Sequence, residues 1–144
     1  MQVARCRPSE VAALLAEYPR LRLVFAHAGL EAWWAEALDC ATGWQHAYLE
    51  LSLWQRCAAE DYTEFRRRIR RMRSQLGAHR LIFGSDIMRG PREDPEGSEL
   101  EDWICRVRDL AAPYAGEPAV LGEEELELFL AGNAVRLYDL KEYA

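Results

Sequence analysis

Three short apolar runs, separated by stretches of helical composition, set the strongest constraint on the fold of this chain. The runs span residues 21–27 (LRLVFAH), 47–53 (AYLELSL) and 80–83 (RLIF), and each has the length and apolar content of a buried strand. The segments between them, 31–41 and 61–76, are rich in good helix formers. Strands that are joined through helices run parallel, with the helices covering the sheet. The order of elements therefore predicts an α/β fold.

The predicted helices show apolar side chains at helical spacing. In segment 61–76 the apolar positions fall four, three and four residues apart, which places on one face Phe65, Ile69, Met72 and Leu76. Gly77 is the expected C-cap of this helix, because glycine readily adopts the left-handed conformation that ends many helices. Further helices are predicted over residues 8–18, 99–112, 123–130 and 134–140. Asn133 is the expected N-cap of the last of them.

The composition fits a single domain spanning residues 1–144. Half of the residues are apolar, and a chain of this length buries roughly two-thirds of the surface that it exposes when unfolded. With 24 acidic and 18 basic residues, the net charge of −6 gives no overall positive field for nucleic acid or an anionic membrane. The basic segment 66–73 (RRRIRRMR) is instead predicted to be the solvated face of an amphipathic helix.

Cysteine spacing and the length of the apolar runs indicate the cellular compartment. The four cysteines form no CxxC pair, so we expect reduced structural thiols at Cys6, Cys40, Cys57 and Cys105. The apolar runs are far shorter than the ~20 residues that a membrane span requires. We therefore expect a soluble cytoplasmic protein that binds neither nucleic acid nor membrane.

Function in parallel α/β folds gathers at the carboxyl ends of the strands, and this rule separates the three histidines. His27 closes the first predicted strand, whereas His46 and His79 precede the second and the third. Asp86 follows the third strand in the segment Gly-Ser-Asp. Imidazole and carboxylate groups brought to one face suit metal ligation or proton transfer. Taken alone, His27 is equally compatible with a structural role, and Asp86 with a turn or helix cap.

Other polar and aromatic residues lie close to the same strand ends. Glu50 and Ser52 come near the end of the second strand, and a long loop rich in proline, glycine and charge covers residues 87–97. Ser52 and Arg89 are the candidate substrate contacts, Arg89 through an anionic group, although a solvated loop arginine is the alternative. Three tryptophans either border a pocket or pack in the core: Trp33, Trp34 and Trp44.

Three segments of the chain resemble the amidohydrolase-related family that includes aminocarboxymuconate-semialdehyde decarboxylase. They are Tyr18–Gly29 (YPRLRLVFAHAG), His79–Gly90 (HRLIFGSDIMRG) and Phe129–Leu140 (FLAGNAVRLYDL). The resemblance implies a (β/α)8 TIM barrel, of which this chain carries strands six to eight with their helices and the C-terminal helices. It assigns the sixth-strand position to His27 and the eighth-strand position to Asp86.

The resemblance also implies a reaction type and a metal. Asp86 would bind a divalent ion, most often zinc, and take a proton from a metal-activated water, whose pKa the metal lowers to about 7. His27 would orient the water, polarise a small-molecule substrate or bind a second metal. The implied activity is that of a metal-dependent hydrolase, with a metal-dependent decarboxylase of the same family as the alternative.

The chain departs from this family in its metal ligands. The family carries an HxH pair on its first strand and another histidine on its fifth, and this chain has neither. A catalytic zinc site takes about three protein ligands, and a whole barrel takes typically ~250 residues. We therefore expect a missing N-terminal barrel half, with the chain inactive alone.

Three origins are compatible with that expectation, and truncation is favoured over a split barrel completed by another chain or an inactive remnant. A homodimer is a further way to cover the exposed strand edges. Two further interpretations remain open, one outside the enzyme class and one outside the barrel family. One is a non-catalytic interaction module that uses its open sheet edges and Trp-rich loops, and the other is a small doubly wound domain with the third strand between the other two.

Overall fold

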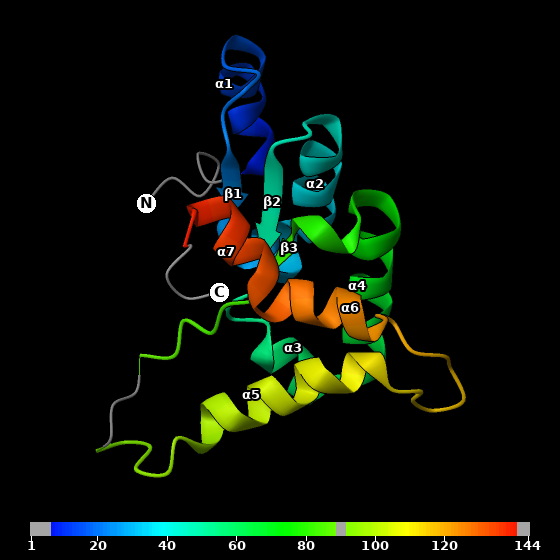
Figure 1. The fold of residues 1–144 in the computed structure, drawn as a ribbon. Coiled ribbons are helices and arrows are strands. Elements are labelled where there is room, and N and C mark those ends of the chain that lie inside the picture. The colour runs from blue at the N-terminus through cyan, green and yellow to red at the C-terminus, as the bar shows by residue number, and fades with distance from the viewer. Residues whose placement is uncertain (1–6, 89–91, 141–144) are drawn as a thin grey trace.

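The computed structural model describes residues 7–88 and 92–140 of the chain (Figure 1). Three short strands form one parallel sheet whose strand order follows the chain. They are β1 (Leu23–Phe25), β2 (Ala47–Glu50) and β3 (Leu81–Ile82). In the sheet, β1 pairs with β2 and β2 pairs with β3. The predicted α/β class is confirmed, and the alternative with the third strand in the middle is excluded.

Each strand is shorter than the sequence pattern predicts. The predicted strand 21–27 ends early because His27 and Ala28 have φ angles of 58° and 44°, which turn the chain out of the extended conformation. The second strand ends at Glu50. The third begins one residue later than predicted, because its expected first residue belongs to the 3-10 turn Ala78–Arg80.

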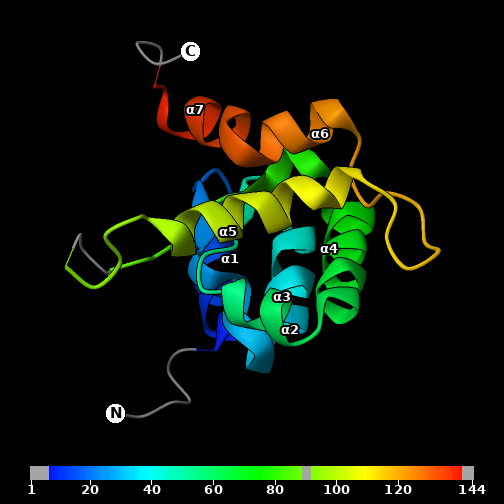
Figure 2. The same cartoon turned by 90° about the horizontal axis from the view of Figure 1, so that it is seen from below.

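The helices between the strands pack on one face of the sheet, and the C-terminal helices pack mainly against β3. On one face, α2 (Leu30–Gly43) contacts β2, and α4 (Tyr62–Leu76) packs beside α2 and contacts β3. On the other face lie α6 (Glu123–Glu127), a π-helical turn (Leu128–Gly132) and α7 (Asn133–Tyr138), of which the turn and α7 contact β3. Seen from below, α7 lies on the opposite side of the molecule from α2 (Figure 2), whereas α6 is joined to α4 by the ion pair of Arg73 with Glu125.

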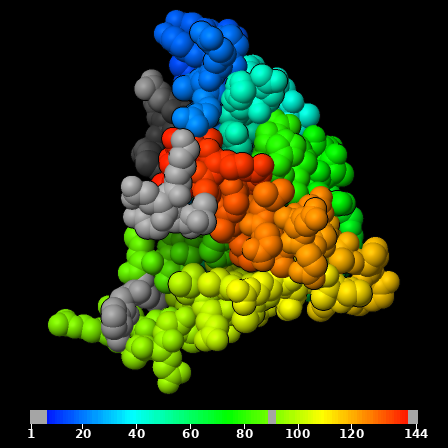
Figure 3. Space-filling model, in the orientation of Figure 1, coloured from blue at the N-terminus to red at the C-terminus, as the bar shows by residue number. Residues whose placement is uncertain are grey.

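The other helices and turns lie around the sheet and the helices packed on it. The 3-10 turn Pro8–Val11 leads into α1 (Ala12–Glu17). The sequence pattern does not predict α3 (Gln55–Glu60), which lies with α5 (Ser98–Arg108) at the end of the sheet toward which the strands point (Figure 1). The 3-10 turn Asp109–Ala111 follows α5. Residues 92–97, which lead into α5, project from the body of the molecule (Figure 3).

The helix predicted over residues 61–76 forms as α4. The side chain of Asp61 caps its start by accepting a hydrogen bond of 2.9 Å from the backbone N–H of Glu64. Gly77 ends it with a φ of 83°, as predicted. The predicted apolar face is buried at all four positions: Phe65, Ile69, Met72 and Leu76.

The prediction of a solvated basic face on α4 is wrong for Arg66, because this residue is only 1% exposed. Its guanidinium donates hydrogen bonds of 2.9–3.0 Å to the carbonyls of Asp109, Ala112 and Pro118. The chain after α5 folds back over α4 and supplies these carbonyls. Other arginines of the helix form ion pairs with Glu64, Glu117 and Glu125.

Asn133 is not the N-cap that the sequence predicts. The helix runs on without a break from the π-helical turn into α7, so no helix end at this position needs a cap. The buried Asn133 side chain instead donates hydrogen bonds of 2.7 Å to the carbonyls of Ala78 and Leu81. Within the π-helical turn, the Phe129 carbonyl accepts a hydrogen bond of 3.0 Å from the backbone N–H of Phe83. The C-terminal helices thereby cover the outer edge at β3.

Three of the four cysteines lie in the described part of the chain, and all three are free thiols, as predicted: Cys40, Cys57 and Cys105. Burial raises the pKa of the Cys40 and Cys57 thiols, which favours their protonated form. Cys6 lies outside the described residues. Of the helices in residues 7–88 and 92–140, none is both long enough and apolar enough to cross a bilayer.

Candidate functional site

After each strand, at or near its carboxyl end, lies a residue other than glycine in the left-handed conformation. The φ angle is 58° at His27, 62° at Leu53 and 50° at Asp86. Each such residue costs on the order of 1 kcal/mol, and strain of this kind collects at functional sites. The carboxyl edge of the sheet is therefore the first place to look for a site.

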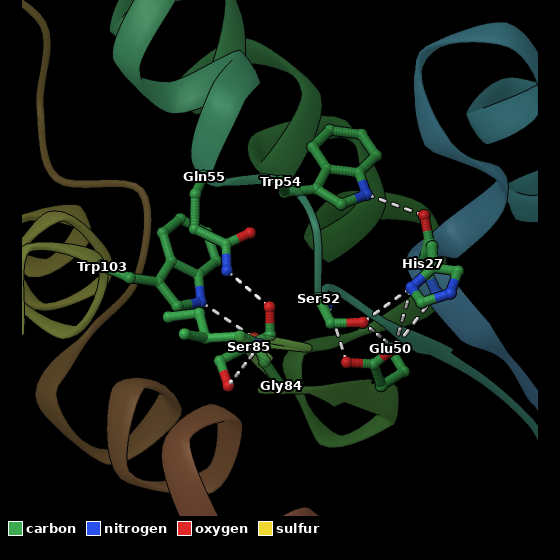
Figure 4. Close-up of polar contacts among 9 residues, drawn as sticks. His27, Glu50, Ser52, Trp54, Gln55, Gly84, Ser85 and Trp103 are labelled. Carbon is green, nitrogen blue, oxygen red and sulfur yellow. Dashed lines mark hydrogen bonds and ion pairs between the residues drawn. The ribbon is translucent and has the colours of Figure 1, made fainter. Parts of the chain in front are cut away.

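A hydrogen-bonded network joins His27 to the end of β2 (Figure 4). The Nδ1 atom of His27 lies 2.7 Å from the hydroxyl oxygen of Ser52. That hydroxyl donates to Oε2 of Glu50 at 2.8 Å, and the backbone N–H of Ser52 donates to Oε1 at 2.7 Å. Oε2 also accepts the backbone N–H of His27 at 3.0 Å. One carboxylate thus holds both the backbone of His27 and the hydroxyl that contacts its ring.

The surroundings fix this network further. The indole N–H of Trp54 donates to the carbonyl of His27 at 2.8 Å. Gly84 lies directly against the carboxylate, because a Cβ atom at position 84 would be 1.8 Å from Oε1 of Glu50. The His27 side chain keeps 35% of its surface exposed, whereas Ser52 is 4% exposed. The imidazole is therefore reachable from solvent, whereas Ser52 is buried and Glu50 is partly buried.

Asp86 lies at the same edge of the sheet but in different surroundings. It is exposed and lines a pocket of about 420 Å³ together with Gln55 and Arg56. The chain leading to it is held by hydrogen bonds from Gln55 to the carbonyl of Ser85 and from Trp103 to the carbonyl of Gly84 (Figure 4). In the part of the chain that the structure describes, no polar contact joins Asp86 to the network of His27.

The described residues do not fit a complete metal site. A catalytic zinc ion takes about three protein ligands, and no three His, Cys, Asp or Glu side chains converge within residues 7–88 and 92–140. The ring nitrogen Nδ1 of His27 is already engaged with Ser52. His46 and His79 lie at the opposite ends of their strands, as predicted, and cannot add to the set at the carboxyl edge.

The sequence places Glu50 near the strand end without giving it a role, and the structure makes it the centre of the network. The alternation along β2 carried the signal. Ala47, Leu49 and Leu51 are buried, so Glu50 and Ser52 share the other side of the strand and its continuation. Arg89, the predicted substrate contact, lies outside the described residues.

A parallel α/β sheet with polar side chains gathered at its carboxyl edge is the arrangement of α/β enzymes that bind ligands at strand ends. The model of the Amidohydrolase family matches residues 2–140, and the chain belongs to this family. Its members generally use divalent metal ions, and membership indicates a function of the metal-dependent hydrolase type. The comparisons with curated proteins and with solved structures gave no significant match.

Proposed function

We propose that this chain supplies strands six to eight and the C-terminal helices of an amidohydrolase-type barrel, and that the completed barrel is a metal-dependent hydrolase. The family match over residues 2–140 is the observation that carries the proposal. The parallel sheet in chain order, with helices between successive strands, is compatible with a segment of such a barrel.

His27 and Asp86 are the proposed active-site residues of this segment. Both follow strands at the carboxyl edge of the sheet, and both have exposed side-chain atoms. In the proposed reaction His27 orients the attacking water or the small-molecule substrate, and the Asp86 carboxylate accepts a proton from that water. Asp86 and His27 are also the proposed protein ligands of the family's divalent ion, for which zinc is our first choice.

The two edges of the sheet support the idea that further strands complete the site. The outer edge of β3 is covered by the Phe129 carbonyl and the C-terminal helices. Within the described residues, β1 has β2 as its sole strand neighbour, so its other edge has no strand partner among them. We propose that the remaining metal ligands come from outside the described residues, either from another segment or from a second chain beside β1.

A non-catalytic module is the second candidate. The observation that favours it is the lack of a polar contact between Asp86 and the His27 network in the described part of the chain, together with the incomplete set of metal donors there. A decarboxylase of the same family remains the alternative reaction for the completed barrel. The two enzyme reactions are distinguished by their products, because decarboxylation releases carbon dioxide and hydrolysis does not.

Calorimetric titration of the purified chain with Zn²⁺ tests the site. We expect His27→Ala and Asp86→Asn each to weaken zinc binding by about tenfold or more, because each removes a ligand. His46→Ala and Asp39→Asn are matched controls, since His46 lies at the other end of the sheet and Asp39 is exposed on α2. Because the proposal places the other ligands outside this segment, we expect weak zinc binding by the unmodified chain. Measurable zinc binding that is equal in all five proteins would overturn the assignment and favour the non-catalytic module.

A further inference from the structure

The protons in the Glu50–Ser52–His27 network can be counted. An ionised carboxylate only accepts hydrogen bonds, and Glu50 accepts three: two from backbone N–H groups and one from the Ser52 hydroxyl. A serine hydroxyl has a single proton to donate, together with lone pairs that accept. Because that proton is directed at Glu50, the remaining contact of the Ser52 oxygen, 2.7 Å from Nδ1 of His27, requires a proton on Nδ1.

We infer that Glu50 and Ser52 are positioning residues that fix His27 as its Nδ1-protonated tautomer and leave Nε2 as an unprotonated acceptor. The tautomer of a histidine is set by the hydrogen bond that its other ring nitrogen makes. The Glu50 oxygen that receives the hydroxyl proton lies 3.9 Å from Nδ1, and its negative charge further favours a proton there.

The same contacts fix where Nε2 points. The backbone N–H of His27 is bound to Glu50, its carbonyl to Trp54, and its ring to Ser52. Rotation of the ring would break the short contact with Ser52. Nε2 is therefore held ready to accept a proton or a hydrogen bond, or to bind a cation. The value of this arrangement for catalysis rests on the proposed function, but the tautomer itself does not.

Nitrogen-15 NMR of the metal-free protein tests the inference directly. The chain has three histidines, and a His27→Gln variant identifies the signals of His27 by their loss. At mildly alkaline pH we expect His27 to show a pyrrole-type Nδ1 and a pyridine-type Nε2, with Nε2 recognised by its coupling to both ring C–H protons. A pyridine-type Nδ1 in the unmodified protein would overturn the inference.

Substitutions of Ser52 test whether its hydroxyl sets the tautomer of His27. We expect Ser52→Ala to shift the His27 signals toward the Nε2-protonated tautomer, and Ser52→Thr, which keeps a hydroxyl, to retain the original pattern. Ser74→Ala is the control, because the Ser74 hydroxyl bonds the Arg71 carbonyl on the exposed side of α4. An unchanged His27 pattern in a folded Ser52→Ala protein would contradict the role of Ser52.

The zinc titration and the NMR measurement of the tautomer can fail independently of each other. If zinc binding does not depend on His27 but the tautomer is as expected, the proposed function falls and the positioning role stands. If zinc binding depends on His27 and Nδ1 is unprotonated in the metal-free protein, the positioning role falls alone.

Discussion

Gly84 is the residue whose substitution tests the site most simply. An added Cβ atom would lie 1.8 Å from Oε1 of Glu50, so the carboxylate must move. Moving it takes acceptors away from the backbone N–H groups of His27 and Ser52. We expect Gly84→Ala to lower the free energy of unfolding by about 2 kcal/mol, measured by urea denaturation, and to disturb the His27 tautomer.

Gly43→Ala is the matched control, because a Cβ atom at that position meets nothing within 4 Å. We expect this variant to unfold within about 0.5 kcal/mol of the unmodified protein and to leave the His27 signals in place. If Gly84→Ala were as stable as Gly43→Ala and kept the His27 signals, the close packing of Glu50 on Gly84 would not exist in solution.

At the scale of elements, Arg66 joins α4 to the chain that follows α5. Its guanidinium binds three backbone carbonyls and lies 5.7 Å from the ring centroid of Tyr62 and 5.5 Å from that of Tyr114. Removing it leaves these carbonyls without their charged donor. We expect Arg66→Ala to cost about 3 kcal/mol in urea denaturation. Arg67→Ala, which removes a largely exposed ion pair with Glu64, should cost less than about 1 kcal/mol.

Glu64, in the first turn of α4, makes the free energy of unfolding depend on pH in the acid range. Hydrogen bonds from Arg67 lower the pKa of Glu64 to about 2, against the opposing effect of burial and with a further contribution from Arg68. The folded-state pKa lies below the ordinary value of 4.5, so Glu64 stabilises the fold fully above about pH 4.5 and loses this effect as the pH falls toward 2.

Thermal unfolding across this pH range checks the contribution. We expect the Tm difference between the unmodified protein and Glu64→Gln to be largest above pH 4.5 and to shrink as the pH falls toward 2. Glu60→Gln, on the exposed ion pair with Arg56, is the control and should show a smaller change. A Tm difference for Glu64→Gln that stayed constant with pH would contradict the assigned pKa.

The elements that the sequence predicts well are those in which local signals agree. The spacing of apolar residues and the C-cap at Gly77 both indicate a helix over residues 61–76, and the structure has this helix as α4. Asn133 shows the limit, because its side chain serves carbonyls more than 50 residues away in the sequence, and no local pattern encodes that contact. Arg66 is similar: its spacing indicates a helix surface, while its burial depends on the returning chain.

At the scale of the whole molecule, the strand ends identify a candidate site from the sequence, but they do not predict its hydrogen bonds. The rule of strand carboxyl ends selects His27 and Asp86 from the sequence, and the structure adds Glu50 as the group that supports His27. Within the described residues Glu50 contacts His27, no polar contact joins Asp86 to them, and no three possible metal donors converge. The proposed completion of the site by further strands is therefore tested at the sheet edge of β1.

The direction of backbone groups along β1 makes that edge testable. The N–H of Leu23 donates to the carbonyl of His46, toward β2, so the N–H of Val24 points to the other edge. Proline is tolerated where a strand N–H faces an open edge and is costly where the N–H is part of the ladder. Tyr48 pairs with Val24 in the central strand and is the matched position.

Urea denaturation of Val24→Ala, Val24→Pro, Tyr48→Ala and Tyr48→Pro gives the free energy of unfolding of each variant. At position 24 we expect the proline variant to be less stable than the alanine variant by less than about 1 kcal/mol. At position 48 we expect this difference to be about 2 kcal/mol or more. The alanine variants remove the effect of the side chain, so the difference isolates the backbone N–H. Equal proline penalties would mean that the Val24 N–H is paired in solution and that the edge is not open. A penalty at position 24 that rises with protein concentration would identify a second copy of the chain as the strand that occupies it, because only an intermolecular pairing depends on concentration.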